Sequence, residues 1–160
     1  MSMPEAISRR KVIQAGLAAA ATVVVWPAPV PARAAQGTAM VVYKSPSCGC
    51  CAKWVDHLRA SGFAPTVHDE EDMDAIKDRL GVPKGVRSCH TAVLGRYLVE
   101  GHVPATDLRS LLAKHPAVAG LAVPGMPSST PGMAAPGAPV EGFEVLAFQH
   151  DGKTQSYARY

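Results

Sequence analysis

Short apolar runs alternate with amphipathic stretches from residue 40 to residue 114. The short runs that contain Val, Thr and Tyr predict strands, and the stretches with apolar side chains three or four residues apart predict helices. Strands are expected over 40–44, 64–68, 89–94 and 97–99, and helices over 52–61, 72–80 and 104–114. Gly62 and Gly81 follow the first two helices and are typical of helix ends. This order of strand, helix, strand, helix, hairpin and helix predicts an α/β protein with a thioredoxin-like layout.

A Pro/Gly/Met-rich segment, residues 116–141, follows the last of these helices. Residues 115–139 hold six prolines and four glycines, a composition that excludes a regular helix or a central strand. Met126 and Met133 repeat the same Pro-Gly-Met context and follow no helical or strand period. A thioether is a soft donor that suits Cu(I), although a methionine in such a loop can also pack on the domain surface. Both residues are therefore candidate ligands, with packing as the alternative.

The C-terminal residues 143–160 predict a β-hairpin. Two alternating runs flank Asp151-Gly152, which is typical of a two-residue turn. That register places Glu144 opposite Arg159 and Phe143 opposite Tyr160, and both are favourable cross-strand pairs.

Residues 1–34 predict an export signal. Arg9 and Arg10 form a twin-arginine pattern, the run over 15–26 is apolar and uncharged, and Ala32-Arg33-Ala34 fits a cleavage site with small residues. The apolar run is too short to span a bilayer comfortably, so we expect no membrane anchor after cleavage. Val12 stands where twin-arginine signals usually carry Phe, which leaves ordinary secretory export as the alternative. The mature chain, residues 35–160, suits a single domain.

The charge of the chain is concentrated in this leader. The 160 residues carry 16 Lys plus Arg and 13 Asp plus Glu, a formal net charge of +3. Four of the basic residues and one acidic residue lie in 1–34, so the rest of the chain has 12 of each and no formal net charge. Without a basic cluster, the mature chain has no feature that supports nucleic-acid binding.

Three of the four cysteines lie within four residues, Cys48, Cys50 and Cys51. They fall between a predicted strand and a predicted helix, at or just before the helix N-terminus. Unpaired backbone N–H groups and the helix dipole favour thiolate over thiol there. A thiolate is both the nucleophile of disulfide exchange and a soft ligand for Cu(I), Zn or iron–sulfur clusters. The motif therefore predicts thiolate chemistry.

Two structural disulfides are the simplest interpretation of four cysteines in an exported protein. The crowding argues against it, because a Cys50–Cys51 bridge would be strained and only Cys48–Cys51 is an easy local pair. Cys50 and Cys89 are then left to pair or to stay free. In thioredoxin-like folds the loop that enters the third strand lies against the active-site turn, so we expect Cys89 to join the other three cysteines.

Two histidines are candidate ligands. His90 adjoins Cys89, and side chains alternate along a strand, so both face one site only if the strand begins there. His102 precedes a helix in a glycine-containing turn and can point either way. We expect the other four histidines to be ordinary surface residues or to be hydrogen-bonded within the fold.

Four motifs of the mature chain occur together in one known family. They are Tyr43-Lys44-Ser45-Pro46-Ser47-Cys48-Gly49-Cys50-Cys51 with Trp54, Ser88-Cys89-His90-Thr91, Glu100-Gly101-His102-Val103-Pro104, and the twin Pro-Gly-Met loop. With them the chain resembles the exported CopG-type copper proteins. The resemblance implies a thioredoxin-like fold, a periplasmic location, a role in copper resistance, and copper bound as a multi-copper thiolate cluster with redox activity on copper. It carries over as copper ligands Cys48, Cys50, Cys51 and Cys89, with Met126, Met133, His90 and His102 as further candidates.

The leading hypothesis is a periplasmic protein that sequesters Cu(I), with copper ions and other periplasmic copper-handling proteins as its expected partners. Cys48 and Cys51 would be its redox-active pair, forming a disulfide as Cu(I) and Cu(II) interconvert. The alternative is a thioredoxin-like thiol–disulfide oxidoreductase acting on proteins, with Cys48 as nucleophile and Cys51 as resolving thiol. A four-cysteine iron–sulfur carrier is a third hypothesis.

Overall fold

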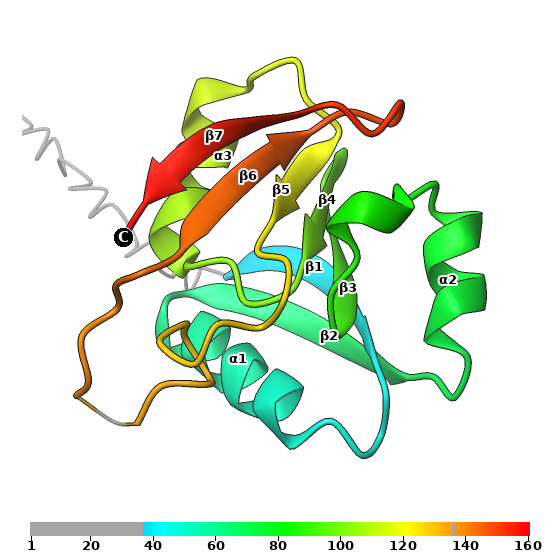
Figure 1. Ribbon diagram of the computed structural model, residues 1–160. Coiled ribbons are helices and arrows are strands. Elements are labelled where there is room, and N and C mark those ends of the chain that lie inside the picture. The colour runs from blue at the N-terminus through cyan, green and yellow to red at the C-terminus, as the bar shows by residue number, and fades with distance from the viewer. Residues whose placement is uncertain (1–36, 136) are drawn as a thin grey trace, which may run out of the picture. The chain divides into compact units, whose positions relative to one another are not determined.

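In the computed structural model, one mixed sheet of seven strands organises the part of the chain that the structure describes, residues 37–135 and 137–160 (Figure 1). The strands are β1 (Thr38–Lys44), β2 (Phe63–Asp69), β3 (His90–Leu94), β4 (Tyr97–Glu100), β5 (Gly120–Ala122), β6 (Glu144–Phe148) and β7 (Thr154–Arg159), in the spatial order β2-β1-β3-β4-β5-β6-β7. The helices are α1 (Gly49–Ala60), α2 (Met73–Arg79), α3 (Ala105–Lys114) and the short 3-10 turn η1 (Lys84–Val86). None of these helices has the length and apolar character needed to cross a membrane. The predicted export signal over 1–34 lies outside the described residues.

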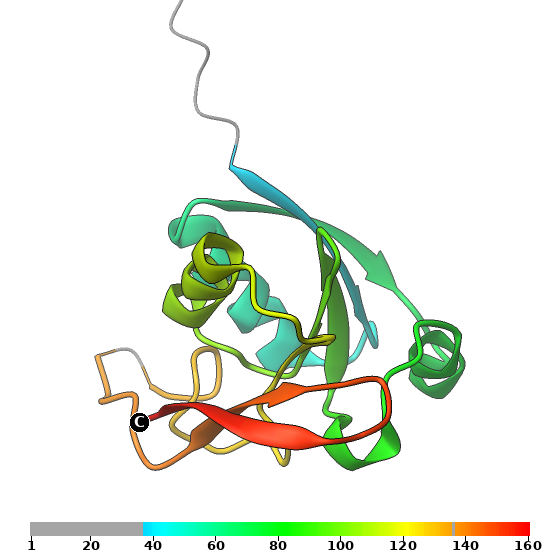
Figure 2. The same cartoon turned by 90° about the horizontal axis from the view of Figure 1, so that it is seen from above.

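Helices α1 and α3 cover one face of the sheet, and α2 lies on the other (Figure 2). The apolar stripe of α1, with Trp54, Val55 and Leu58, packs with that of α3, which includes Leu108 and Leu111. Each stripe follows the spacing of three or four residues that places side chains on one helix face. The predicted α/β class and the element order over residues 40–114 are confirmed.

Strand β5 lies inside the segment expected to be a loop, so that expectation is wrong over Gly120–Ala122. The prolines that suggested a loop flank a proline-free stretch, residues 117–123, which pairs with β4 on one side and β6 on the other. A Cβ atom at Gly120 would lie 1.9 Å from the carbonyl oxygen of Leu98, so the close approach of β5 to β4 requires glycine there. The composition of the whole segment concealed this short strand.

The C-terminal hairpin has the predicted end pairs but a different turn. The backbone N–H of Gln149 donates to the oxygen of Lys153, so three residues rather than two form the turn. An irregularity between Val145 and Leu146 then shifts the register by one residue. The shift compensates for the longer turn, and Glu144 lies opposite Arg159 as predicted. At the open end the rings of Phe143 and Tyr160 stack, with centroids 4.8 Å apart.

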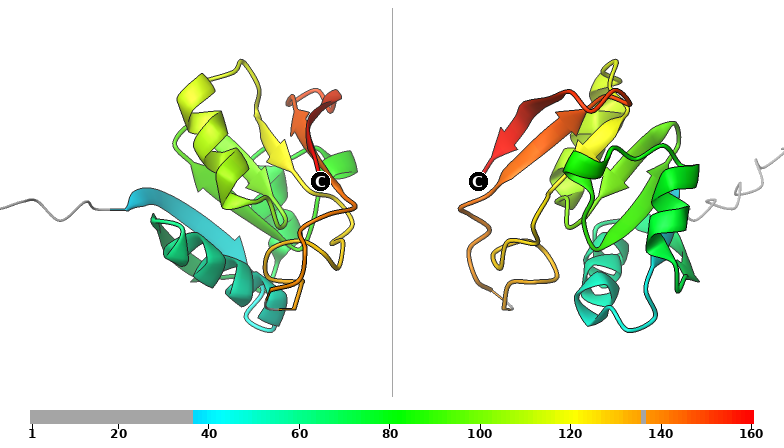
Figure 3. Two further views of the ribbon diagram at one scale, coloured as in Figure 1. Left: turned by 90° about the vertical axis from the view of Figure 1, so that its left-hand side faces the viewer. Right: turned by 45° about the vertical axis from the view of Figure 1, so that its right-hand side comes forward.

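The segment between β5 and β6 returns to α1 before it enters the hairpin (Figures 1 and 3). A Cβ atom at Gly132 would lie 2.7 Å from the backbone nitrogen of Trp54 and 3.0 Å from the carbonyl oxygen of Cys50. The loop therefore packs directly on the first turns of α1, beside the cysteines.

Candidate metal centre

The cysteine turn connects β1 to α1. Cys48 caps α1 without a side-chain hydrogen bond to the helix, and its own N–H donates to the oxygen of Ser45 at 3.0 Å. Cys50 and Cys51 lie in the first turn, where backbone N–H groups have no partner within the helix. The helix N-terminus favours negative charge at these sulfur atoms.

The four sulfur atoms form one group, with all Sγ–Sγ distances within 4.8 Å. Cys48 and Cys51 form a disulfide, with their Cα atoms 5.3 Å apart, and the Sγ atoms of Cys48 and Cys50 are 3.5 Å apart. Cys50 and Cys89 are free thiols. The expectation that Cys89 joins the other cysteines is confirmed.

Antiparallel pairing explains how Cys89 reaches the turn. Lys44, the last residue of β1, lies opposite His90, the first residue of β3. The residue before β3 and the residues after β1 therefore emerge at the same edge of the sheet. Burial raises the pKa of the Cys89 thiol to about 11, and the neighbouring Cys50 adds to the rise.

Two buried imidazoles extend the sulfur group inwards. The reactive atoms of Cys51, Cys89, His90 and His102 also lie within 4.8 Å of one another. His90 is the first residue of its strand, so Cys89 lies before the strand and its side chain need not point to the opposite face from His90. The Sγ atom of Cys89 lies 3.3 Å from His90 Nδ1. The His90 ring lies between those of Trp54 and His102, with centroid separations of 4.2 and 5.2 Å.

The Nε2 atoms of both histidines are buried and have no hydrogen-bond partner. His102 Nδ1 donates to the carbonyl oxygen of Pro131 at 2.7 Å, because a carbonyl only accepts, and this leaves the lone pair on Nε2. Burial lowers the pKa of His90 well below its usual range and also lowers the pKa of His102. The lowered pKa values favour the neutral imidazole, which is the form that binds metals.

The two candidate methionines lie in different surroundings. Met126 is 44% exposed. Met133 lines a surface pocket on the outer side of α1, together with Lys53, Asp56 and His57. Their assignment as ligands stays a prediction. His57 accepts a hydrogen bond from the backbone N–H of Ala105 at 3.3 Å, in line with the hydrogen-bonded role expected of it.

Comparisons with known proteins identify the family. A family model described as a protein of unknown function, DUF411, matches residues 86–133. A solved structure of copper resistance protein CopG, Form 1, is 43% identical, with a TM-score of 0.70, and covers 78% of this chain and 98% of that one. The chain belongs to the CopG family. Form 2 of that CopG protein is also 43% identical, with a TM-score of 0.69 and coverage of 76% and 97%. A comparison with curated proteins found no match.

The CopG resemblance indicated by the motifs is therefore confirmed. The family model spans the distal part of the centre, including Cys89, His90 and His102, and begins after the Cys48–Cys51 turn. The CopG structures align over nearly their whole length, so the shared fold is not limited to that part.

The donor set of this CopG chain is chemically soft. Four cysteine sulfurs form one group, two imidazoles form a second group with Cys51 and Cys89, and no carboxylate belongs to either group among the described residues. Thiolates select Cu(I), Zn²⁺ and iron–sulfur clusters, and imidazole suits copper and zinc. The buried Nε2 atoms without partners are the polar groups that a bound metal would satisfy.

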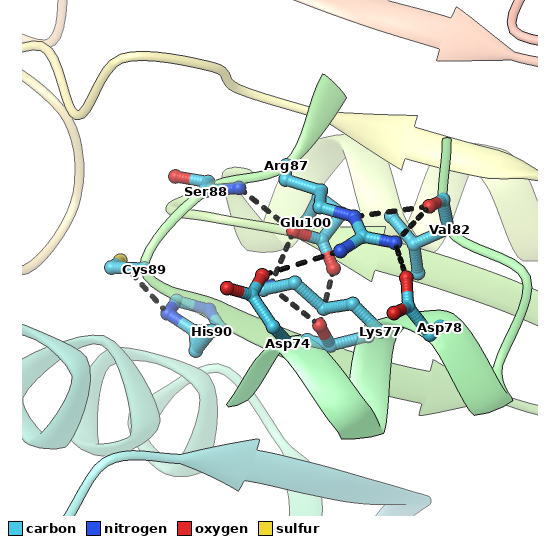
Figure 4. Close-up of polar contacts among 10 residues, drawn as sticks. Asp74, Lys77, Asp78, Val82, Arg87, Ser88, Cys89, His90 and Glu100 are labelled. Atoms are coloured by element: carbon cyan, nitrogen blue, oxygen red, sulfur yellow. Dashed lines mark hydrogen bonds and ion pairs between the residues drawn. The ribbon is translucent and has the colours of Figure 1, made fainter. Parts of the chain in front are cut away.

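Sequence reasoning missed a buried ion pair behind the Cys89 segment, Lys77 with Glu100 (Figure 4). In the sequence, Lys77 is one charge in a charged helix and Glu100 is an acid at the end of a strand. The hydrophobic pattern distinguishes neither residue from an ordinary surface charge, and the family motif that contains Glu100 does not indicate a partner for it.

Proposed function

We propose that this protein is an exported copper-binding protein that sequesters Cu(I) and contributes to copper resistance. The observation that carries the proposal is the convergence of four sulfur atoms from two separate segments, within 4.8 Å of one another. Membership of a family that includes a copper resistance protein supports the same conclusion.

The crowding of the thiols favours more than one copper ion. Three of the four sulfurs come from four consecutive residues, which cannot easily surround a single tetrahedral ion. Adjacent thiolates can instead bridge neighbouring Cu(I) ions. The neutral imidazoles of His90 and His102 are candidate donors on the buried side. Met126 and Met133 stay candidates whose Leu variants test them, because leucine keeps the apolar volume and removes the sulfur donor.

The Cys48–Cys51 disulfide supports a coupling between copper and redox state. Forming this disulfide from the two thiols releases two electrons and two protons, enough to reduce two Cu(II) to two Cu(I). In the reverse step two Cu(I) give up two electrons and become two Cu(II), and with two protons from solvent the disulfide becomes two thiols, which restores two sulfur donors. Oxidation of the pair therefore removes half of the sulfur ligands, so that copper release follows oxidation.

The arrangement of the elements supports a thioredoxin-like core. Strands β1 to β4 pair in the order β2-β1-β3-β4, with β1 parallel to β2, and the cysteines lie at the first strand–helix junction. We propose that the chain is exported through the signal in residues 1–34 to the periplasm, where copper ions and other copper-handling proteins are its partners.

The disulfide at the N-terminus of α1 also favours a second candidate function, thiol–disulfide exchange with other proteins. Cys48 would attack the substrate disulfide and Cys51 would resolve the mixed disulfide. The two additional thiols speak against this role, because they offer competing partners to the mixed disulfide.

An anaerobic titration tests the proposal. The purified, reduced protein is titrated with Cu(I) against a chromophoric chelator, beside the single variants Cys48→Ser, Cys50→Ser, Cys51→Ser and Cys89→Ser. We expect more than one Cu(I) per chain in the unaltered protein and fewer in each variant. Absence of tight Cu(I) binding, together with metal-free reduction of insulin, would reject copper sequestration in favour of disulfide exchange.

A further inference from the structure

The ion pair between Lys77 and Glu100 is almost completely buried. Lys77 comes from α2 and Glu100 ends β4, and their side chains are 4% and 0% exposed. Lys77 Nζ donates to Glu100 Oε2 at 2.8 Å and to Thr91 Oγ1 at 2.7 Å. The Thr91 hydroxyl in turn donates to Glu100 Oε1. Each charge therefore has both an opposite charge and further hydrogen bonds.

A buried pair of this kind is not in itself a stabilising feature. Removing two charges from water costs several kcal/mol for each ion, and apolar side chains of similar volume often serve the fold as well. A role for this pair therefore has to come from the groups that it holds in place.

Glu100 reaches the segment that supplies the distal ligand. The backbone N–H of Ser88 donates to Glu100 Oε2 at 2.9 Å (Figure 4). The Thr91 hydroxyl binds the other carboxylate oxygen. Ser88 precedes Cys89, and Thr91 follows His90. The carboxylate thus binds both ends of the two-residue segment whose side chains face the sulfur group.

A second anchor holds the same loop one residue earlier. Arg87 donates to the carbonyl oxygen of Val82 and pairs with Asp74 and Asp78 of α2 (Figure 4). These two carboxylates are exposed, whereas Glu100 is fully buried. The Arg87 anchor acts before Ser88, whereas Glu100 binds the backbone N–H of Ser88, the residue next to Cys89.

We propose that Glu100, balanced in charge by Lys77, is a positioning residue that holds Cys89 at the copper site. This inference rests on the proposed function for its copper readout, but not for its effect on the metal-free thiol. Glu100 acts on Cys89 through the backbone of Ser88, and its carboxylate belongs to neither group of candidate ligands. Loss of such an orienting partner typically weakens metal binding by about 10- to 100-fold.

Two double variants separate positioning from the loss of charge. K77M/E100Q removes both charges and keeps a carbonyl oxygen that can accept from the Ser88 N–H. K77M/E100L removes both charges and the acceptor, with a side chain of similar size. Because both variants lack Lys77, its electrostatic effect on the Cys89 thiol is the same in the two.

The first readout needs no metal. In protein with the Cys48–Cys51 disulfide formed, Cys50 and Cys89 are alkylated with a maleimide, and each site is followed by peptide mapping. We expect Cys89 to react about tenfold faster in K77M/E100L than in K77M/E100Q, since an unanchored segment opens more often. Cys50 belongs to the other segment, and its rate should be equal in the two variants. The second readout is Cu(I) affinity in the reduced protein, about 10- to 100-fold weaker in K77M/E100L.

Equal Cys89 rates and equal Cu(I) affinities in the two double variants would overturn the positioning role. Faster reaction of Cys50 and Cys89 together would also overturn it, because that pattern means general loosening of the fold. If the protein without substitutions bound no Cu(I), the proposed function would fail, while the alkylation comparison would still decide the role of Glu100. Amide hydrogen exchange of Ser88 in the unsubstituted protein is a check that requires no variant, and an unprotected Ser88 amide would contradict the inference.

Discussion

Replacing Gly132 by alanine tests whether the Pro/Gly/Met-rich segment is docked on the cysteine helix. Gly132 has a φ of +87°, and a Cβ atom there would lie 2.7 Å from the backbone nitrogen of Trp54. Two costs therefore add. The left-handed backbone costs an L-residue about 1–2 kcal/mol, and the overlap costs a further ~1–3 kcal/mol because backbone atoms cannot rotate away.

Gly125 provides a matched control. Its φ is +75°, but no atom lies within 4 Å of the position of an added Cβ. Gly125→Ala should therefore carry only the backbone cost, and the difference between the two variants isolates the close approach. For a domain of this size, each kcal/mol lowers Tm by about 3–5 °C. Thermal unfolding followed by circular dichroism measures both variants under identical conditions.

The same substitution should also weaken copper binding. Pro131, next to Gly132, accepts the hydrogen bond that orients His102. Displacing the loop removes this bond, so we expect Cu(I) affinity to fall about tenfold or more in Gly132→Ala and to stay unchanged in Gly125→Ala. If Gly132→Ala were no less stable than Gly125→Ala, the docked position of the loop beside α1 would be refuted.

Three further predictions follow from individual contacts. Because the pKa of Cys89 is about 11, its thiol is protonated at neutral pH and must lose that proton to bind Cu(I). Below that pKa, Cu(I) affinity should therefore rise with pH more steeply in the unaltered protein than in Cys89→Ser. The loss of one proton makes the difference between the two slopes up to about tenfold in affinity per pH unit. Equal slopes would mean that Cys89 is not a ligand. Trp54→Phe removes the buried donor to the carbonyl oxygen of Val103, 2.9 Å away, and should cost about 1–3 kcal/mol in chemical denaturation, whereas an unchanged midpoint would contradict that contact. Glu144→Gln breaks an exposed pair with Arg159, so Tm should show no measurable change, and a clear loss of Tm would show that the hairpin depends on this pair.

Local patterns were sufficient for most of the fold. The period of the apolar side chains predicted α1, α2, α3 and the strands before them. Each of these elements buries one face, and the apolar residues of that face recur at a regular spacing within the element. Strand β5 was missed for the opposite reason. It is three residues long, and its hydrogen bonds come from β4 and β6, which are distant in sequence.

The hairpin shows how a correct pairing can follow from an incomplete local interpretation. Asp151-Gly152 predicted a two-residue turn, and the turn contains three residues. The ends pair as expected only because the irregularity at Val145 and Leu146 compensates for the extra residue. The identity of those two residues does not predict that shift in register.

The sequence alone determined the soft chemistry of the centre, since thiol spacing and position before a helix are local properties. It could not determine which buried groups have partners. The unpaired Nε2 atoms of His90 and His102 and the Lys77–Glu100 pair depend on contacts between separate elements. Lys77 and Glu100 are 23 residues apart, and His102 and Pro131 are 29 residues apart. Burial and hydrogen bonding are relations between distant segments. Only the tertiary structure therefore decided which side chains surround the cysteine cluster and which contacts hold them in place.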